Sequence, residues 1–188
     1  MFDNGDVPGV LVSMLRVGLI SDTHGLLRPE ASAFLRGCGH IVHGGDIGTP
    51  DVLQALAAIA PITAVRGNND KGSWAEALPE TELVYFEQVF VYVIHDLAQL
   101  DIEPRAAGVS VVVSGHSHQP SIRQRRGVLY VNPGSAGPRR FRLPVAVAEL
   151  DIAGKSVTSR IVQLGDRSGG SRPPVPLLRV RKPCAGTL

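Results

Sequence analysis

"VGLISDTHG", residues 17–25, is a short apolar run that ends in polar residues and a glycine. Apolar runs of this length that stop at a turn signal are typical of buried strands. Asp22 and His24 directly follow the run and are two positions apart, so in an extended segment their side chains point to the same side. The stretch therefore predicts a buried strand that ends by presenting a carboxylate and an imidazole together.

The same pattern recurs along the chain in Val- and Ile-rich runs that end near glycine, asparagine, aspartate or histidine. Between the first runs, "RPEASAFLRG" and "TPDVLQALAAI" carry helix signals, the second with Thr49 as N-cap and Pro50 at the first helical position. The first third is therefore β-α-β-α-β with parallel strands, whereas the second half is typical of antiparallel hairpins. The later runs are "HIVHGGD" (40–46), "ITAVRGNND" (62–70), "VFVYVIHD" (89–96), "VSVVVSGHSH" (109–118) and "VLYVNPGS" (128–135).

Length, composition and charge indicate one globular domain. The chain has 188 residues, of which 44% are hydrophobic, enough for a sizeable core. The net charge of +2 conceals a C-terminal segment with five basic residues and one acidic residue, so the rest is slightly acidic. This balance argues against a nucleic-acid partner or an anionic membrane surface. We expect an irregular leader at 1–14, a domain at 15–165 and a Pro-, Gly- and Arg-rich, poorly ordered tail at 166–188.

Cysteine content and the N-terminal segment bear on location. Only Cys38 and Cys184 are present, so neither a disulfide framework nor a thiolate metal cluster is indicated. The apolar run at 10–20 contains Arg16, lacks the basic flank of a signal peptide and is too short to span a bilayer. We therefore expect a cytoplasmic protein with no membrane partner, and a homo-oligomer is compatible with the sequence.

Metal-donor side chains gather where the predicted strands end, and ligands of an open α/β sheet bind beyond the carboxyl ends of its strands. A lone Asp-x-His motif also occurs in ordinary loops, and His43, inside a predicted strand, is better explained as a hydrogen-bonded core histidine. Seven donors at five strand ends are different, because such a cluster without a cation would leave desolvated carboxylates. The seven are Asp22, His24, Asp46, Asn68, His95, His116 and His118.

The ordered blocks "SDTHG", "HGGDIG", "RGNND", "VIHD" and "SGHSHQP" resemble those of the calcineurin-like metallophosphoesterases. The further block "VNPGS" makes the chain most similar to their small single-domain branch, which includes bacterial phosphodiesterases and the retromer scaffold subunit. The resemblance implies a mixed α/β fold, a four-layer αββα sandwich of two mixed β-sheets flanked by helices.

The resemblance also implies a ligand set and a mechanism. A metal-bridging hydroxide would attack a phosphate ester without a protein nucleophile, and Asp46, Asn68 and His95 would be catalytic. Two divalent cations are expected, Mn²⁺ on family grounds, with Fe, Zn²⁺ and Ni²⁺ also compatible with oxygen and imidazole ligands. The first metal would be held by Asp22, His24, Asp46 and His118, and the second by Asp46, Asn68, His95 and His116.

One position departs from the family pattern. Many relatives have a histidine between the Asn and Asp of the G-N-x-D block, where it is thought to protonate the leaving group, and this chain has Asn69. Asparagine cannot act as a general acid at neutral pH, although it can donate a hydrogen bond. Besides the ligands, we expect Arg66, Asn69 and Asn132 to lie nearest the substrate.

The sequence therefore predicts a dinuclear-metal-dependent phosphoesterase, with a small phosphodiester as the expected substrate. The alternative is a catalytically weak, protein-binding scaffold of the same fold, which would be expected to have replaced ligands, whereas all seven are present. A metal-dependent nuclease is disfavoured by the near-neutral body and by the lack of aromatic residues interleaved with basic ones around the motifs.

Overall fold

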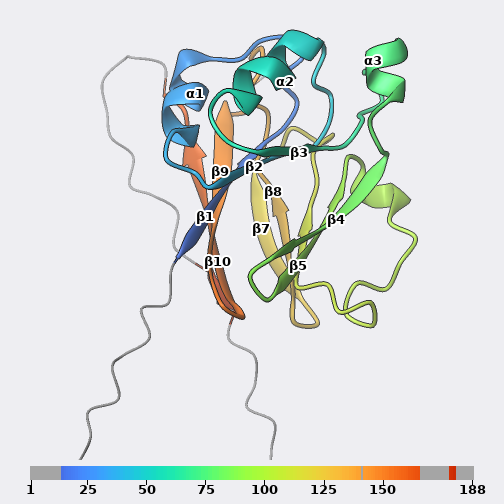
Figure 1. Cartoon of the computed structure of the whole chain (residues 1–188), viewed down its shortest axis with the longest axis vertical. Coiled ribbons are helices and arrows are strands. Elements are labelled where there is room, and N and C mark those ends of the chain that lie inside the picture. The colour runs from blue at the N-terminus through green and yellow to red at the C-terminus, as the bar shows by residue number, and fades with distance from the viewer. Residues whose placement is uncertain (1–13, 141, 166–177, 181–188) are drawn as a thin grey trace, which may run out of the picture.

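The computed structural model describes residues 14–140, 142–165 and 178–180. Two β-sheets pack against each other, as Figure 1 shows. Sheet A has six strands in the order β11-β10-β9-β1-β2-β3, and sheet B has five in the order β4-β5-β6-β8-β7. Both contain parallel and antiparallel pairs, which confirms the predicted sandwich of two mixed sheets. Residues 1–13 of the predicted leader and most of the predicted tail lie outside the described residues.

Sheet A contains the predicted β-α-β-α-β unit, in which β1, β2 and β3 are parallel. Figure 1 shows β9, from the far end of the chain, beside β1, and the two strands are antiparallel. The short strand β11, which the sequence analysis did not predict, pairs with β10 at the edge. The bounds are Leu15–Ile20 (β1), Pro29–Leu35 (α1), His40–His43 (β2), Pro50–Ala57 (α2), Ile62–Ala64 (β3), Ala146–Ala153 (β9), Ser156–Gln163 (β10) and Leu178–Val180 (β11).

Sheet B is built from two hairpins joined through a central strand. The β4–β5 and β7–β8 pairs are antiparallel, and β6 lies between β5 and β8 and runs parallel to both. A short helix, α3, and a 3₁₀ turn, η1, lie in the connections. The bounds are Ser73–Glu76 (α3), Thr81–Phe86 (β4), Val89–Ile94 (β5), Leu97–Gln99 (η1), Val111–Val113 (β6), Ser121–Arg125 (β7) and Val128–Asn132 (β8).

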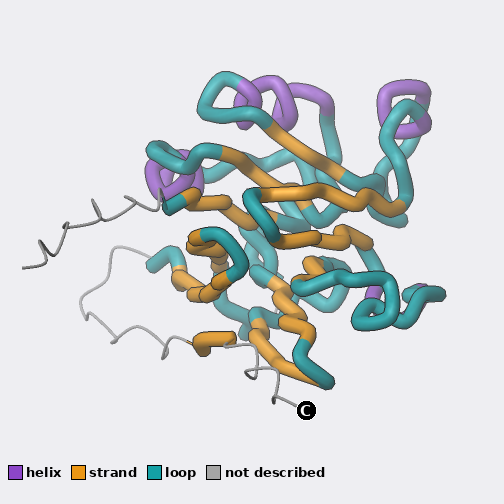
Figure 2. The backbone as a smooth tube through the Cα atoms, turned by 60° about the horizontal axis from the view of Figure 1, so that its bottom comes forward, coloured by secondary structure: helices purple, strands orange, loops and turns teal. Residues whose placement is uncertain are grey.

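Strand alternation divides the core into layers. Val17 and Leu19 of β1 pack between the sheets with Val91 of β5, whereas Ile20 belongs to the cluster beneath α1 and α2. In Figure 2 the strands run through the interior and the helices lie at the periphery. No helix in the described part of the chain is long and apolar enough to cross a membrane.

The outer face of sheet B is covered differently from that of sheet A. Its apolar cluster includes Tyr92 and Val112, which pack with Leu100 and Ile102 of the β5–β6 connection. That connection contains η1 and turns but no α-helix. Pro104 and the lack of a helical apolar period account for this. The fourth layer of the sandwich is thus a 3₁₀ turn with irregular chain.

Gly18 provides a test of the packing between α1 and β1. A Cβ atom at this position would lie 2.3 Å from Cδ2 of Leu35, which is itself fully buried. Gly18→Ala is therefore expected to lower the free energy of unfolding by about 1–3 kcal/mol, measured by urea denaturation of the metal-free protein. Gly165→Ala is the matched control, because no atom lies within 4 Å of its added Cβ. An unchanged midpoint for Gly18→Ala would contradict the close packing of α1 on β1.

Candidate metal centre

Four of the seven predicted donors meet at one point beyond the strand ends. Asp22 and His24 follow β1, Asp46 follows β2 and His118 follows β6, and one ligand atom of each lies within 4.8 Å of the others. Nε2 of His118 is 3.1 Å from Oδ1 of Asp22 and 3.4 Å from Nε2 of His24. These four side chains could hold a metal ion, and they are the four that the resemblance assigns to the first metal.

The surroundings of Asp22 favour a cation. Its side chain is fully buried, and neither carboxylate oxygen accepts a hydrogen bond from any described residue. The 3.1 Å contact with His118 lacks hydrogen-bond geometry, and Nδ1 of His118 also has no partner. A buried carboxylate that has neither a hydrogen-bond donor nor a cation beside it strongly destabilises the folded state. The carboxylate and imidazole donors around it suit a divalent ion such as Mn²⁺ or Zn²⁺.

The other three donors gather around a second point beside Asp46. Oδ1 of Asn68 is 3.1 Å from Nε2 of His95 and 3.0 Å from Nδ1 of His116. Asp46 contacts both groups, because Oδ1 is 3.4 Å from Nε2 of His95 and Oδ2 is 3.8 Å from Nε2 of His24. The structure thus brings all seven predicted donors together, with Asp46 between the two groups.

The backbone at these positions differs from the extended conformation that the sequence analysis assumed. Five of the seven donors have positive φ, a conformation that non-glycine residues rarely adopt and that clusters at functional sites. Asp22 and His24 do meet at one point, but the extended conformation assumed for them was wrong, because left-handed turns aim these side chains. The φ values are 53° for Asp22, 46° for His24, 55° for Asp46, 63° for His116 and 55° for His118.

Asp46 is held by Asn69 on one side and by His95 on the other. The backbone N–H of Asn69 donates to Oδ1 at 2.8 Å, and its side-chain amide donates to Oδ2 at 2.6 Å. Burial by itself would raise the pKa of Asp46, but the hydrogen bonds from His95 and Asn69 outweigh it and hold this pKa well below its usual range. Asp46 is thus ionised, and its carboxylate is held in one orientation. Contact between Asn69 and the substrate stays a prediction.

His95 is oriented through its second ring nitrogen. Nδ1 donates to the carbonyl oxygen of Gly44 at 2.7 Å, which leaves Nε2 facing Asp46 and Asn68. Burial lowers the pKa of His95, but the hydrogen bonds to Asp46 and Gly44 more than compensate, so the pKa is raised. Gly45 leaves room for this ring, because a Cβ there would lie 2.6 Å from Nδ1.

Two buried side chains that are not ligands join the loops of the centre. Asp70 accepts hydrogen bonds from the backbone N–H groups of Gly48 and Gly67, both at 2.8 Å, and so ties the loop after β2 to the loop after β3. His43 accepts from the N–H of Gly45 at 3.1 Å and lies 3.0 Å from Oγ1 of Thr23. Burial lowers the pKa of His43 to about 4, so the ring is neutral at neutral pH. His43 is the hydrogen-bonded core histidine that the sequence predicted.

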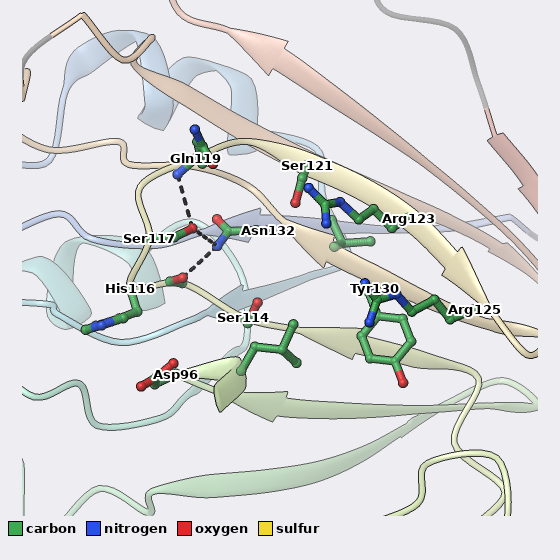
Figure 3. Close-up of a pocket in the computed structure, with 13 residues that line it drawn as sticks. Asp96, Ser114, His116, Ser117, Gln119, Ser121, Arg123, Arg125, Tyr130 and Asn132 are labelled. Atoms are coloured by element: carbon green, nitrogen blue, oxygen red, sulfur yellow. Dashed lines mark hydrogen bonds between the residues drawn. The ribbon is translucent and has the colours of Figure 1, made fainter. Parts of the chain in front are cut away.

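Arg66 and Asn132, predicted near the substrate, both have partners within the chain. Arg66 forms an exposed ion pair with Glu80. The amide of Asn132 donates to the carbonyl of Gly115 at 2.6 Å and to Oγ of Ser117 at 3.1 Å, as the dashed lines in Figure 3 show. Asn132 therefore holds the loop that carries His116 and His118. Substrate contacts of Arg66 and Asn132 stay predictions.

Three residues on the rim of the centre were not predicted from the sequence. Arg123 and Arg125 of β7 and Tyr130 of β8 line a hollow that also includes His116. The available signal was the alternation of polar residues in "SIRQR" (121–125), which places Ser121, Arg123 and Arg125 on one face of the strand.

Metal binding is expected to stabilise the protein through Asp22. Mn²⁺ at about 100 times its dissociation constant should add about 2.7 kcal/mol to the free energy of unfolding, seen as a rise in melting temperature. Asp22→Asn should lose most of this rise. With chelator present, this variant should be at least as stable as wild type, because it removes an unpaired buried charge. The exposed Asp51 supplies the control, Asp51→Asn, which should respond to metal like wild type. A full metal response in Asp22→Asn would show that Asp22 is not a ligand.

Comparisons with known proteins agree with this geometry. Residues 15–155 match the family model of the calcineurin-like phosphoesterase superfamily domain. A "Probable metallophosphoesterase" of Methanothermobacter thermautotrophicus is 36% identical over 162 residues, which cover 79% of this chain and 92% of that protein.

Two solved structures share the fold. Vacuolar Protein Sorting 29 from Cryptosporidium parvum has a TM-score of 0.75 at 18% identity, covering 90% of this chain and 99% of its own. Yfce, a phosphoesterase from E. coli, has a TM-score of 0.66 at 21% identity, covering 89% and 100%. These two structures show the fold alone, whereas the family-model match over residues 15–155 and the 36% identical relative show that the chain belongs to the calcineurin-like phosphoesterase superfamily.

Proposed function

We propose that this protein is a dinuclear-metal phosphodiesterase that acts on a small phosphate ester in the cytoplasm. The observation that carries the proposal is that Asp46 contacts both groups of metal donors, one through each of its two carboxylate oxygens. When bound, two divalent cations, Mn²⁺ in our proposal, would activate water and neutralise the charge of the phosphoryl oxygens. A cytoplasmic location is supported by Cys38, a buried free thiol.

The chain's own residues hold this site in one arrangement. Asp22, which is buried and unpaired, would ligate the first cation, with His24 and His118 beside it. His95 and Asn68 would ligate the second with His116, and the neutral amide of Asn68 limits the negative charge there. Hydrogen bonds behind the ligands keep their donor atoms aimed before substrate arrives.

The hydrogen bonds of the serines favour attack by water over a covalent intermediate. Among the described residues, no serine hydroxyl is hydrogen bonded to a histidine, as an activated nucleophile would be. Ser21 is fully buried and its Oγ lies 3.4 Å from the carbonyl of Gly45, while Ser135 donates to the carbonyl of Asp22 at 2.9 Å. These serines support the loops of the centre.

Removal of Asp46 tests the shared ligand. After reconstitution with Mn²⁺, wild type is expected to hold two ions per chain and to hydrolyse bis(p-nitrophenyl) phosphate. Asp46→Ala should lower the content of both ions and reduce kcat/KM by more than the roughly 100-fold that loss of a hydrogen bond behind a ligand costs. Elemental analysis and initial rates measure both effects, with Asp51→Asn as the control. Failure of wild type to hydrolyse phosphomonoesters, diesters and cyclic nucleotides with Mn²⁺, Fe²⁺, Zn²⁺ and Ni²⁺ would refute the proposal.

Asn69 bears on which esters are cleaved well. Its amide is directed to Asp46 and cannot supply a proton, so aryl esters with low leaving-group pKa should be cleaved faster than alkyl esters. The dependence of rate on leaving-group pKa should therefore be steep in wild type. Asn69→His should flatten it by raising the rate on poor leaving groups, where general acid catalysis is worth about 10²- to 10⁴-fold.

Asn69→Ala separates the two roles of this residue. It removes the hydrogen bond to Asp46 without adding an imidazole, so it should slow all esters by a similar factor and keep the steep dependence. A dependence that is already flat in wild type would mean that another group supplies the proton.

A catalytically weak scaffold is the second candidate function. Leu83 and Tyr85 of β4 and Phe90 of β5 are large apolar side chains that are 49%, 56% and 39% exposed, and such surface is typical of protein-binding sites. The fold likeness to Vacuolar Protein Sorting 29 supports the same candidate. Stoichiometric metal binding without turnover on any ester would favour the scaffold.

A further inference from the structure

A hollow of about 220 Å³ opens beside the metal centre, between the end of β5 and the β7–β8 hairpin (Figure 3). His116 and Asp96 lie at the end nearest the centre, and Arg123, Arg125 and Tyr130 line the part that extends along the hairpin. It is smaller than the roughly 300–1,000 Å³ typical of a pocket for a whole small-molecule ligand. The hollow therefore suits one part of a substrate whose scissile phosphate lies at the metal centre.

The strand register places the cationic side chains on the outer face of sheet B. Ser121 pairs with Asn132 and Arg123 pairs with Tyr130. Ile122, on the opposite face, packs against the core between the sheets. Arg123 therefore shares the outer face with Ser121, about 7 Å further from the metal centre along the strand.

The two arginines in this hollow have no charge partner in the described part of the chain. Neither Arg123 nor Arg125 forms an ion pair or hydrogen bond with any described residue. By contrast, Arg126 in the same hairpin lies 3.7 Å from a carboxylate oxygen of Glu103 and does not line the hollow. Asp96 is the one acidic residue in the lining, and it accepts a hydrogen bond from the N–H of Ala98 at 2.9 Å. The hollow is thus positively charged and its two guanidinium groups are available to a ligand.

A second hollow, on the other side of His116, is lined by more acidic than basic side chains. It measures about 670 Å³ and includes Asn68 and His95 in its lining. Its charged lining residues are Arg66, Asp70, Lys71, Glu76, Glu80, Asp96 and Asp101. Because Arg66 pairs with Glu80, little positive charge is left there for an anion. An anionic extension of a substrate bound at the metal centre is therefore directed to the β7–β8 side.

We propose that the hollow at Arg123 and Arg125 binds a second phosphate group of the substrate, so the preferred substrate is a phosphodiester whose non-leaving arm carries a further phosphate. This inference rests on the phosphodiesterase function proposed above. Arginine is suited to phosphate because its planar fork donates two parallel hydrogen bonds. The ring of Tyr130 offers a face against which a sugar or a base packs. A phosphorylated nucleoside ester has this combination of groups.

The subsite can be tested by binding, without turnover. Calorimetric titration of the metal-free protein, with chelator present, would compare thymidine 3′,5′-bisphosphate with thymidine 5′-phosphate. Wild type should bind the bisphosphate about tenfold more tightly, a difference of about 1.4 kcal/mol. The double variant Arg123→Gln/Arg125→Gln should bring the ratio close to one. Arg126→Gln is the matched control from the same hairpin and should keep the wild-type ratio.

A matched pair of substrates tests the same subsite in the Mn²⁺-loaded enzyme. The p-nitrophenyl ester of thymidine 5′-phosphate would be compared with the same ester carrying a 3′-phosphate. In wild type the 3′-phosphate should raise kcat/KM roughly tenfold, mainly through KM, because the added contact is remote from the bond that breaks. In the double variant the two esters should have similar kcat/KM values. Since all three arginines are exposed, melting temperatures should confirm that the variants are folded.

The outcomes distinguish the subsite from the function on which it rests. A preference for the bisphosphate that the double variant loses, without hydrolysis of any ester, would support the subsite and refute the phosphodiesterase. Hydrolysis with equal kcat/KM for both esters and equal binding of both nucleotides would support the phosphodiesterase and overturn the subsite. A loss of preference in Arg126→Gln as large as in the double variant would also overturn it, because the effect would then reflect overall charge.

Discussion

The buried carboxylate of Asp22 is the constraint on which the rest of the site depends. It lies at the end of the central strand β1, fully enclosed and without a hydrogen-bond donor among the described residues, so it destabilises the folded state unless a cation binds beside it. The seven metal donors, which come from five strand ends, lie around this position in two groups. The stability of the fold and the occupancy of the centre are therefore expected to be linked.

The loops around the centre hold strained backbone in place by close contacts. The left-handed conformations of the five aspartate and histidine donors are unfavourable in isolation, and they persist because neighbouring loops restrict them. Gly67 approaches so closely that a Cβ there would lie 2.1 Å from the backbone nitrogen of Asp46. Asp70 and Asn132 then join loops that are distant in sequence. The aim of the ligands is thus a property of the packed loops together.

Charged side chains are distributed asymmetrically around the centre, and this determines the side toward which the proposed substrate extends. On one side of His116 are the guanidinium groups of Arg123 and Arg125, which have no partner among the described residues, and on the other is a hollow with several carboxylates. A substrate phosphate bound at the metals would therefore extend its anionic part over the β7–β8 hairpin. The exposed apolar side chains of Leu83, Tyr85 and Phe90 lie on β4 and β5, at the opposite edge of sheet B from the β7–β8 hairpin.

The sequence by itself determined the β-α-β-α-β unit and the seven donors, because apolar runs and the residues that end them are local signals, and its resemblance to a known family implied the two mixed sheets. Only the tertiary structure decided that left-handed turns aim the ligands, that Asn69 is directed to Asp46, and that a 3₁₀ turn covers sheet B. It also decided that β11 pairs with β10 and that Arg123 and His116 line the same hollow. These features depend on which distant segments pack together, and a single short stretch of sequence carries no record of its neighbours in space.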